Sequence, residues 1–188
     1  MRKLIVTEFV SLDGVMEAPG GEPGFRHSGW TMDFPMEGAQ LRFKLDEVLD
    51  AESLLLGRVT YEGFAEAWPE RTGEFADRMN GMPKHVVSST LRELSWENST
   101  LLEGDVPSAV GALKSGEGGD ILVAGSRTLV QALVAHALVD EYRLMVYPVI
   151  LGSGRRLFPD DLKSKTTLSL VDTTVFENGV SVSTYRFA

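Results

Sequence analysis

The segment 120–130 restricts the fold of this chain more than any other part of the sequence. An apolar run at 121–124 has the length of a buried strand, and Gly125 and Ser126 then end it. The residues that follow can begin a helix, so we predict a strand, a glycine turn and a helix in direct succession. The first amides of such a helix have no partner inside the helix and attract anions, most often phosphate. The same residues are also compatible with a turn that only connects two elements.

The pattern occurs at two earlier places in the chain. An apolar run at 54–56 leads into Gly57, Arg58 and Thr60, and a second run leads into Ser88. Three predicted strands therefore end in small or hydroxylated residues. Because ligands of open α/β sheets bind at the carboxyl ends of the strands, we expect the three ends to surround one extended anionic ligand, such as a dinucleotide.

Composition excludes several classes of function. The 188 residues are most simply one domain, 1–188, and the formal net charge of −9 argues against a generic nucleic-acid or anionic-membrane surface. The chain has no cysteine and its three histidines are scattered, so no metal site is predicted. No apolar run approaches the roughly 20 residues that span a bilayer. We expect a cytoplasmic protein.

The remaining patterns predict an α/β chain that ends in an antiparallel pair of strands. Apolar residues at helical spacing, Leu41, Leu45, Val48 and Leu49, predict a helix that packs them on the sheet. Asn-Gly at 178–179 is a strong hairpin signal. We expect further strands at 3–10, 85–87, 100–102, 141–149, 168–175 and 180–187, and helices at 37–50, 60–68, 74–79, 107–114 and 128–137.

Two candidate site residues lie early in the chain. Asp13 precedes a glycine after the first predicted strand, which by itself indicates a tight turn. The loop 16–35 that follows is dense in glycine and proline and contains Trp30. Long loops of this kind are usually functional or disordered, and the tryptophan favours a covering flap.

A later loop, 148–158, has a composition that suits phosphate binding. It contains Gly154 and the arginine pair Arg155 and Arg156, and it is equally compatible with a plain surface turn. His85, a lone histidine at the start of a predicted strand, fits a strand-end residue better than a ligand.

Five short motifs, taken in order, resemble the dihydrofolate reductase superfamily. The resemblance is closer to the RibD C-terminal domain, the reductase half of the bifunctional deaminase-reductase of riboflavin biosynthesis, and to its small stand-alone relatives. It covers nearly the whole chain and implies a three-layer fold with a mixed, mostly parallel sheet of about eight strands and flanking helices. The motifs are Ser11-Leu12-Asp13-Gly14, Leu56-Gly57-Arg58-Val59-Thr60-Tyr61, Val87-Ser88-Ser89, Val123-Ala124-Gly125-Ser126, and the run from Tyr147 to Gly154 with Leu157-Phe158.

The resemblance implies NADPH bound across the strand ends. Arg58 suits a 2′-phosphate because its guanidinium is always charged and forked. Asp13 is the first candidate for a catalytic residue that orients or protonates the substrate, and Trp30, Gly154 and Arg155 are the candidates for binding it. The implied cofactor-binding residues are Gly57, Arg58, Thr60, Ser88, Ser89, Gly125, Ser126, Arg127 and Thr128.

The implied activity is hydride transfer from NADPH to a small pyrimidine or pterin heterocycle, as in the reductase step of riboflavin biosynthesis on a ribosylamino-pyrimidine. The relatives also imply a homodimer. Dihydrofolate reductases proper use a carboxylate on the first helix, which Trp30, Asp33, Pro35 and Glu37 match only roughly. The alternatives are therefore a dihydrofolate reductase proper, a non-catalytic nucleotide- or pterin-binding module, and a dimeric scaffold with a vestigial cleft.

Overall fold

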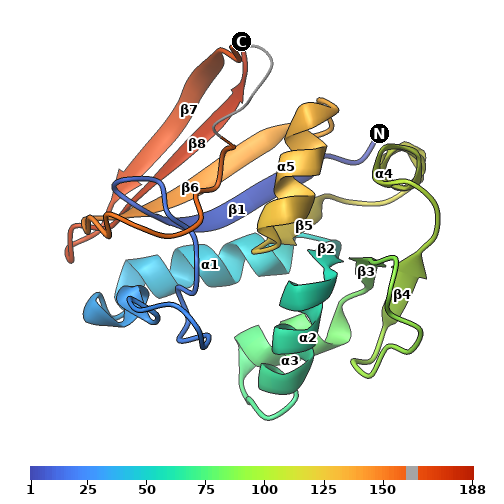
Figure 1. Ribbon diagram of the computed structural model, residues 1–188, viewed down its shortest axis with the longest axis horizontal. Coiled ribbons are helices and arrows are strands. Elements are labelled where there is room, and N and C mark those ends of the chain that lie inside the picture. Colours follow the sequence, from blue (N-terminus) through green and yellow to red (C-terminus); the bar gives the residue numbers. More distant parts are fainter. Residues whose placement is uncertain (160–164) are drawn as a thin grey trace.

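A computed structural model describes residues 1–159 and 165–188, and within them the chain forms one eight-stranded sheet flanked by helices (Figure 1). The strand order is β4-β3-β2-β5-β1-β6-β8-β7. The strands are β1 (Leu4–Ser11), β2 (Ser53–Gly57), β3 (Lys84–Val87), β4 (Ser99–Leu102), β5 (Ile121–Ala124), β6 (Glu141–Tyr147), β7 (Leu168–Val175) and β8 (Ser181–Phe187). The helices are the 3-10 turn η1 (Trp30–Asp33) and α1 (Gly38–Asp50), α2 (Arg58–Ala67), α3 (Glu74–Gly81), α4 (Val106–Ser115) and α5 (Arg127–Ala135).

The sheet is mostly parallel, with an antiparallel edge at the end of the chain. Strands β1 to β6 pair in parallel, β8 is antiparallel to β6, and β7 is antiparallel to β8. The predicted hairpin between β7 and β8 closes through a bond from the Gly179 amide to the Phe176 carbonyl. The predicted fold class is confirmed.

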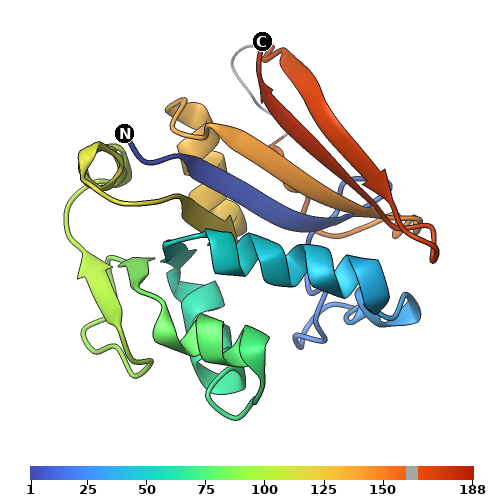
Figure 2. The ribbon, with the colours of Figure 1, turned by 180° about the vertical axis from the view of Figure 1, so that it is seen from behind.

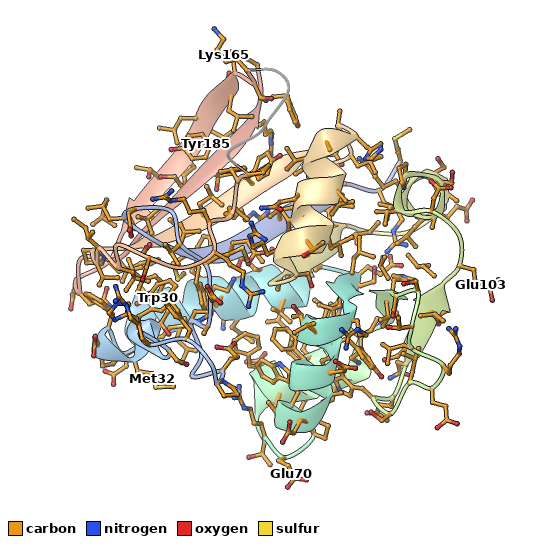
Figure 3. All side chains as sticks on the ribbon, in the orientation of Figure 1. Trp30, Met32, Glu70, Glu103, Lys165 and Tyr185 are labelled. Atoms are coloured by element: carbon orange, nitrogen blue, oxygen red, sulfur yellow. The ribbon has the colours of Figure 1, made fainter. Side chains whose placement is uncertain are left out.

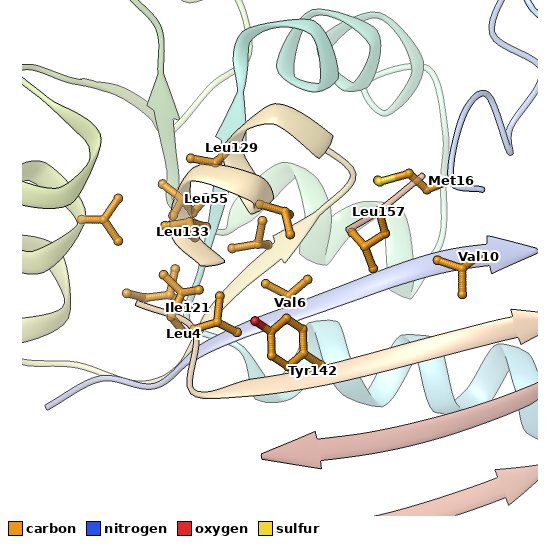
Figure 4. Close-up of a cluster of buried hydrophobic side chains, with 14 residues drawn as sticks. Leu4, Val6, Val10, Met16, Leu55, Ile121, Leu129, Leu133, Tyr142 and Leu157 are labelled. Carbon is orange, nitrogen blue, oxygen red and sulfur yellow. The ribbon is translucent and has the colours of Figure 1, made fainter. Parts of the chain in front are cut away.

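Helices cover both faces of the sheet. Helices α4 and α5 pack on one face, where Leu129 and Leu133 of α5 meet Val6 and Leu55 (Figure 4). Helices α1, α2 and α3 pack on the other face, around Leu54 and its neighbours. Figure 1 shows α5 in front of β1, and Figure 2, from behind, shows α1 running alongside the same strand. The helices that follow β1 and β5, α1 and α5, therefore lie on opposite faces of the sheet.

A third apolar cluster anchors the long loop before α1. Trp30 of η1 is 4% exposed and meets the ring of Tyr147 edge to face, with 5.3 Å between the ring centroids. Met32, on the same short turn, is 65% exposed. Figure 3 shows this contrast, with Trp30 inside the molecule and Met32 at its periphery. The loop is held by its aromatic side chain.

The predicted apolar face of α1 is wrong by one residue. Leu41 is 43% exposed, and the buried positions are Gln40, Lys44, Glu47 and Val48. The helical spacing was right, but the face that packs inward is rotated by the angle of one residue. The reason is that Lys44 and Glu47 neutralise each other inside the protein, at an Nζ to Oε2 distance of 2.5 Å. Strand β6 and helix α5 also end two residues earlier than predicted, within the usual variation of element ends.

Candidate functional site

The three strand ends singled out by the sequence lie side by side. Strands β3, β2 and β5 are neighbours in the sheet and run parallel, so their carboxyl ends share one edge. Strand β2 runs into α2 after Gly57, and β5 runs into α5 after Ser126. Among the described residues, neither of these N-cap residues caps its helix with a side-chain hydrogen bond. Both helices therefore present uncapped first turns, which favour an anion.

Side-chain hydrogen bonds hold the two helix starts together. The Gly57 amide donates to Ser126 Oγ at 2.8 Å, and the Ser126 amide donates to Thr60 Oγ1 at 2.8 Å. Gly125 has φ +66°, and a Cβ there would lie 2.9 Å from Thr60 Cγ2. Only glycine fits this turn without strain. The positive ends of the two helix dipoles consequently converge, and we call the first turns of α2 and α5 with these four residues the paired helix starts.

Strand β1 extends past the end of β5 at the same edge. Strand β5 pairs with β1 over its whole length and ends at Ala124, opposite Thr7, whereas β1 continues along β6 as far as Ser11. The next amide, that of Gly125, donates to the side chain of Glu8 at 3.0 Å from Oε2. Because the helices that follow β1 and β5, α1 and α5, lie on opposite faces of the sheet, this step is a topological switch point, the usual ligand position in open α/β sheets.

Glu8 is a residue of this edge that the sequence reasoning missed. It is 3% exposed, and burial raises the pKa of its carboxyl well above the usual value, although the Gly125 amide and the charge of Lys44 act in the opposite direction. The available signal was Glu8 itself, the single charged residue inside strand β1. A buried acidic side chain needs either a hydrogen-bonding or ionic partner or a bound proton.

Asp13 lies in the predicted turn, and its carboxylate accepts three hydrogen bonds. Oδ1 accepts from Ser11 Oγ at 2.7 Å and from the Leu151 amide at 3.1 Å, and Oδ2 accepts from the Gly152 amide at 2.9 Å. Partial burial would raise the pKa of Asp13, but the bonds from Ser11, Leu151 and Gly152 outweigh it and lower the pKa. This geometry suits an ionised carboxylate that orients neighbouring groups. It suits a proton donor less well. Its catalytic role stays a prediction.

The loop with the arginine pair joins the Asp13 turn to the start of α5. Arg155 pairs with Glu17 at 2.8 Å, and Arg156 Nε donates to the Asp13 carbonyl at 3.1 Å. Arg127 Nε donates to the Arg156 carbonyl at 2.8 Å. Asp13, Arg127 and Arg155 are thus brought to the same edge of the sheet.

Gly154 in this loop has a packing reason to be glycine. Its φ is +117°, and a Cβ would lie 2.6 Å from Val15 Cγ1 and 2.9 Å from Phe25 Cζ. The glycine lets the loop lie against the segment that follows Asp13. Its predicted part in substrate binding is untested.

The other predicted residues are distributed around the edge. Arg58 Nη1 lies 3.0 Å from Glu62 Oε2, and the arginine side chain is 46% exposed. Ser88 Oγ accepts from the amides of Thr90 and Leu91, which closes the turn after β3. Ser89 and Thr128 are exposed. Trp30 is buried, so a ligand would reach it only after the loop moves.

Metal and membrane features are absent from the described part of the chain. Within residues 1–159 and 165–188, no group of three or more His, Asp or Glu side chains is placed to hold a metal ion. In the same ranges, no helix has the length and apolarity needed to cross a membrane.

A comparison with known families identifies the family of this chain. The model of the RibD C-terminal domain family matches residues 2–182. The chain belongs to this family. Two relatives in Bacillus subtilis strain 168 are the uncharacterized proteins YyaP, 27% identical over 99% of this chain and 95% of YyaP, and YwjB, 28% identical over 98% of both chains. The RibD C-terminal family therefore accounts for almost the entire length.

Solved structures share the fold at low sequence identity. A proposed riboflavin biosynthesis protein from Shewanella sp. PV-4 matches with a TM-score of 0.76 at 20% identity, over 99% of both chains. A pyrimidine reductase-like protein from Corynebacterium diphtheriae matches with 0.67 at 13% identity, over 100% of this chain and 92% of its own. Dihydrofolate reductase from Enterococcus faecalis, in complex with NADP(H) and RAB-propyl, matches with 0.61 at 16% identity, over 98% of this chain and 96% of its own. These matches confirm the predicted dihydrofolate reductase-like fold.

Proposed function

We propose that this chain is an NADPH-dependent reductase that transfers hydride to a small pyrimidine or pterin heterocycle. The observation that carries the proposal is the pair of uncapped helix starts, tied together through Gly57 and Ser126 at the carboxyl edge of a parallel sheet. Two converging helix N-termini suit the diphosphate of a dinucleotide, since each supplies free amides and a positive dipole end. Membership of a reductase-domain family supports the same activity.

The strand order gives the bound dinucleotide a direction. Arg58 and the hydroxyls of Ser88 and Ser89 lie beyond β5 on the side of β2 and β3, where they would hold the adenosine half and its 2′-phosphate. The other half then extends from the paired helix starts toward β1. It would reach the step beside Glu8 and the turn of Asp13.

In this reaction the protein mainly has to align the cofactor with the substrate. A bound nicotinamide supplies the hydride, and the protein holds an electrophilic ring carbon of the substrate against it. Asp13 would orient the heterocycle through its fixed carboxylate, and Arg155, at the rim of the same loop, would meet a phosphate carried by the substrate. After a movement of the long loop, Trp30 would cover the substrate.

A non-catalytic binding module is the second candidate, and one observation favours it. The carboxylate of Asp13 accepts three hydrogen bonds and its pKa is lowered, so the turn offers no obvious acid. This candidate predicts that bound NADPH is never oxidised by any heterocycle. Dihydrofolate reduction proper is less well supported, because Asp33 and Glu37 are exposed and Glu47, the buried carboxylate of α1, is bonded to Lys44 and Thr7.

The first test is a titration of the protein with NADPH and with NADH, followed by tryptophan fluorescence. We expect NADPH to bind more tightly. Arg58→Ala should weaken NADPH roughly 10- to 100-fold, the loss of a hydrogen bond to a charged group, and leave NADH almost unchanged.

Arg42→Ala is the matched control for this variant. Arg42 forms the same kind of i, i+4 pair on the surface of α1, with Asp46, and should not affect either nucleotide. Equal weakening of NADPH and NADH by Arg58→Ala would remove the 2′-phosphate assignment. Failure of both nucleotides to bind the unmodified protein would refute the reductase proposal.

A further inference from the structure

Glu8 has an oxygen that no described residue satisfies. Oε2 accepts the Gly125 amide, but Oε1 is buried and has no hydrogen-bond partner within residues 1–159 and 165–188. A buried, unpaired carboxylate oxygen is costly, and proteins seldom retain one without a reason. Glu8 comes one residue after the last β1–β5 pair, Thr7 and Ala124, and its side chain bonds the turn that begins α5.

The surroundings of Glu8 favour its neutral form. The charged group that acts on it is Lys44 of α1, and that ammonium is already paired with Glu47 and bonded to Thr7 Oγ1 at 2.8 Å. Strand β5 is apolar over its whole length, and at its end it contributes the Gly125 amide. Arg127, at the start of α5, directs its Nε to the Arg156 carbonyl. Burial therefore dominates and raises the pKa of the carboxyl, which favours the protonated form.

The position of the proton follows from the hydrogen bonding. Since Oε2 receives an N–H from Gly125, the acidic hydrogen belongs on Oε1. Oε1 is buried, so a ligand acceptor would reach it only after the groups around the step beyond β5 move, and that acceptor would satisfy it. A carboxylate there would instead repel a diphosphate held at the neighbouring helix starts.

We propose, building on the dinucleotide site of the proposed function, that Glu8 is a cofactor-binding residue. As a neutral carboxylic acid it donates a hydrogen bond from Oε1 to an oxygen of the dinucleotide half that extends past the diphosphate toward β1. The adenosine half lies on the side of β2 and β3 and does not contact Glu8.

Two variants of Glu8 separate this role from simple packing. Glu8→Gln keeps a donor and the acceptor for Gly125, whereas Glu8→Met fills the same space with no donor. We expect Glu8→Met to weaken NADPH about tenfold, the loss of one hydrogen bond, and Glu8→Gln to bind within about threefold of the unmodified protein. Fluorescence titration at pH 7 measures both.

A fragment locates the contact. Adenosine 2′,5′-bisphosphate carries only the adenosine half, so its affinity should be the same for both variants and the unmodified protein. Equal weakening of this fragment and of NADPH by Glu8→Met would show a general structural effect and overturn the assignment. An unchanged NADPH affinity in Glu8→Met would overturn it too.

The pH dependence provides a second readout. Between pH 7 and pH 9 the 2′-phosphate stays ionised, while ionisation of Glu8 would remove the donor and add a negative charge. As the pH rises through the pKa of Glu8, the unmodified protein should lose NADPH affinity relative to Glu8→Gln, and a steeper loss in Glu8→Gln would contradict the proposal.

Glu141→Gln is the matched control, because Glu141 is a buried carboxylate at the start of the neighbouring strand β6, in register with Ile5. It should leave NADPH affinity unchanged at every pH. If the unmodified protein binds no NADPH, the proposed function fails together with the Glu8 assignment. If NADPH binds and Glu8→Met leaves its affinity unchanged, only the Glu8 assignment fails.

Discussion

At the scale of single residues, Asp13 shows how one carboxylate can organise a loop. Its two oxygens bind the amides of Leu151 and Gly152, which come from a part of the chain far from it in sequence. The loop with Gly154 and Arg155 is therefore fixed beside the turn after β1. Sequence reasoning identified Asp13 as a turn residue, which the structure confirms, and as a site candidate, which stays a prediction.

Asp13→Asn should lower turnover about 10- to 100-fold while the affinity for NADPH changes less than about threefold. The new amide NH₂ would face the N–H of Gly152 and lose that bond, so the substrate loop would loosen. Single-turnover oxidation of NADPH, with the heterocycle that supports it in the unmodified protein, measures the effect. Asp33→Asn, at an exposed carboxylate on η1, is the control, and full activity in Asp13→Asn would leave Asp13 as a turn residue only.

At the scale of secondary-structure elements, Lys84 joins three segments. It is fully buried, and its Nζ donates to the carbonyls of Asn80 at 2.6 Å, Met82 at 2.8 Å and Glu97 at 3.1 Å. The ammonium also lies 4.2 Å from the ring centroid of Trp96. One side chain thus holds the end of α3, the start of β3 and the approach to the edge strand β4.

Lys84→Met should lower the free energy of unfolding by about 3 kcal/mol, because it leaves buried carbonyl groups without a donor. Urea denaturation followed by tryptophan fluorescence measures this change. Lys3→Met, at an exposed lysine, should change the value by less than about 0.5 kcal/mol. A loss in Lys84→Met no larger than that of the control would show that the three carbonyls find other partners.

The elements were predictable to different degrees for physical reasons. Apolar runs followed by glycine or serine, as at Gly57 and Gly125, combine two independent local signals, and the strands and helix starts were found. The buried face of α1 was not, because Lys44 and Glu47 look like surface residues until Thr7 is brought beside them by the fold. The pairing of Gly57 with Ser126 likewise depends on strand order, which local patterns do not contain.

At the scale of the whole molecule, a chain of charged side chains links the parallel part of the sheet to its antiparallel edge. Glu141 of β6 binds Arg143 at 2.7 Å and Arg186 of the antiparallel strand β8 at 2.7 Å. Arg143 also reaches Glu47 of α1 at 3.4 Å. Burial opposes ionisation of Glu141, but the bonds from Arg186 and Arg143 outweigh it and lower its pKa.

This arrangement predicts a loss of stability in acid. The folded pKa of Glu141 is lower than the unfolded value of about 4.5, so the unfolded chain takes up the proton first as the pH falls. The contribution is complete above that value and disappears as the pH falls through the folded pKa. The stability difference between the unmodified protein and Glu141→Gln should therefore shrink from pH 6 to pH 3 in urea denaturation. A constant difference would contradict the assignment.

Assembly is a further property at this scale. The homodimer implied by the family resemblance stays a prediction, and sedimentation analysis of the purified chain tests it. The cytoplasmic location expected from the sequence stays a prediction as well.

The different lengths of the central strands give the carboxyl edge of the sheet a stepped outline. The whole of β5, Ile121 to Ala124, pairs with β1, and β1 then continues beside β6 as far as Ser11. Beyond Ala124, the extended part of β1 therefore has a strand neighbour on one side only. Any molecule that lies in this step contacts both β1 and the start of α5, so occupancy of this edge should stiffen the fold on both sides of it.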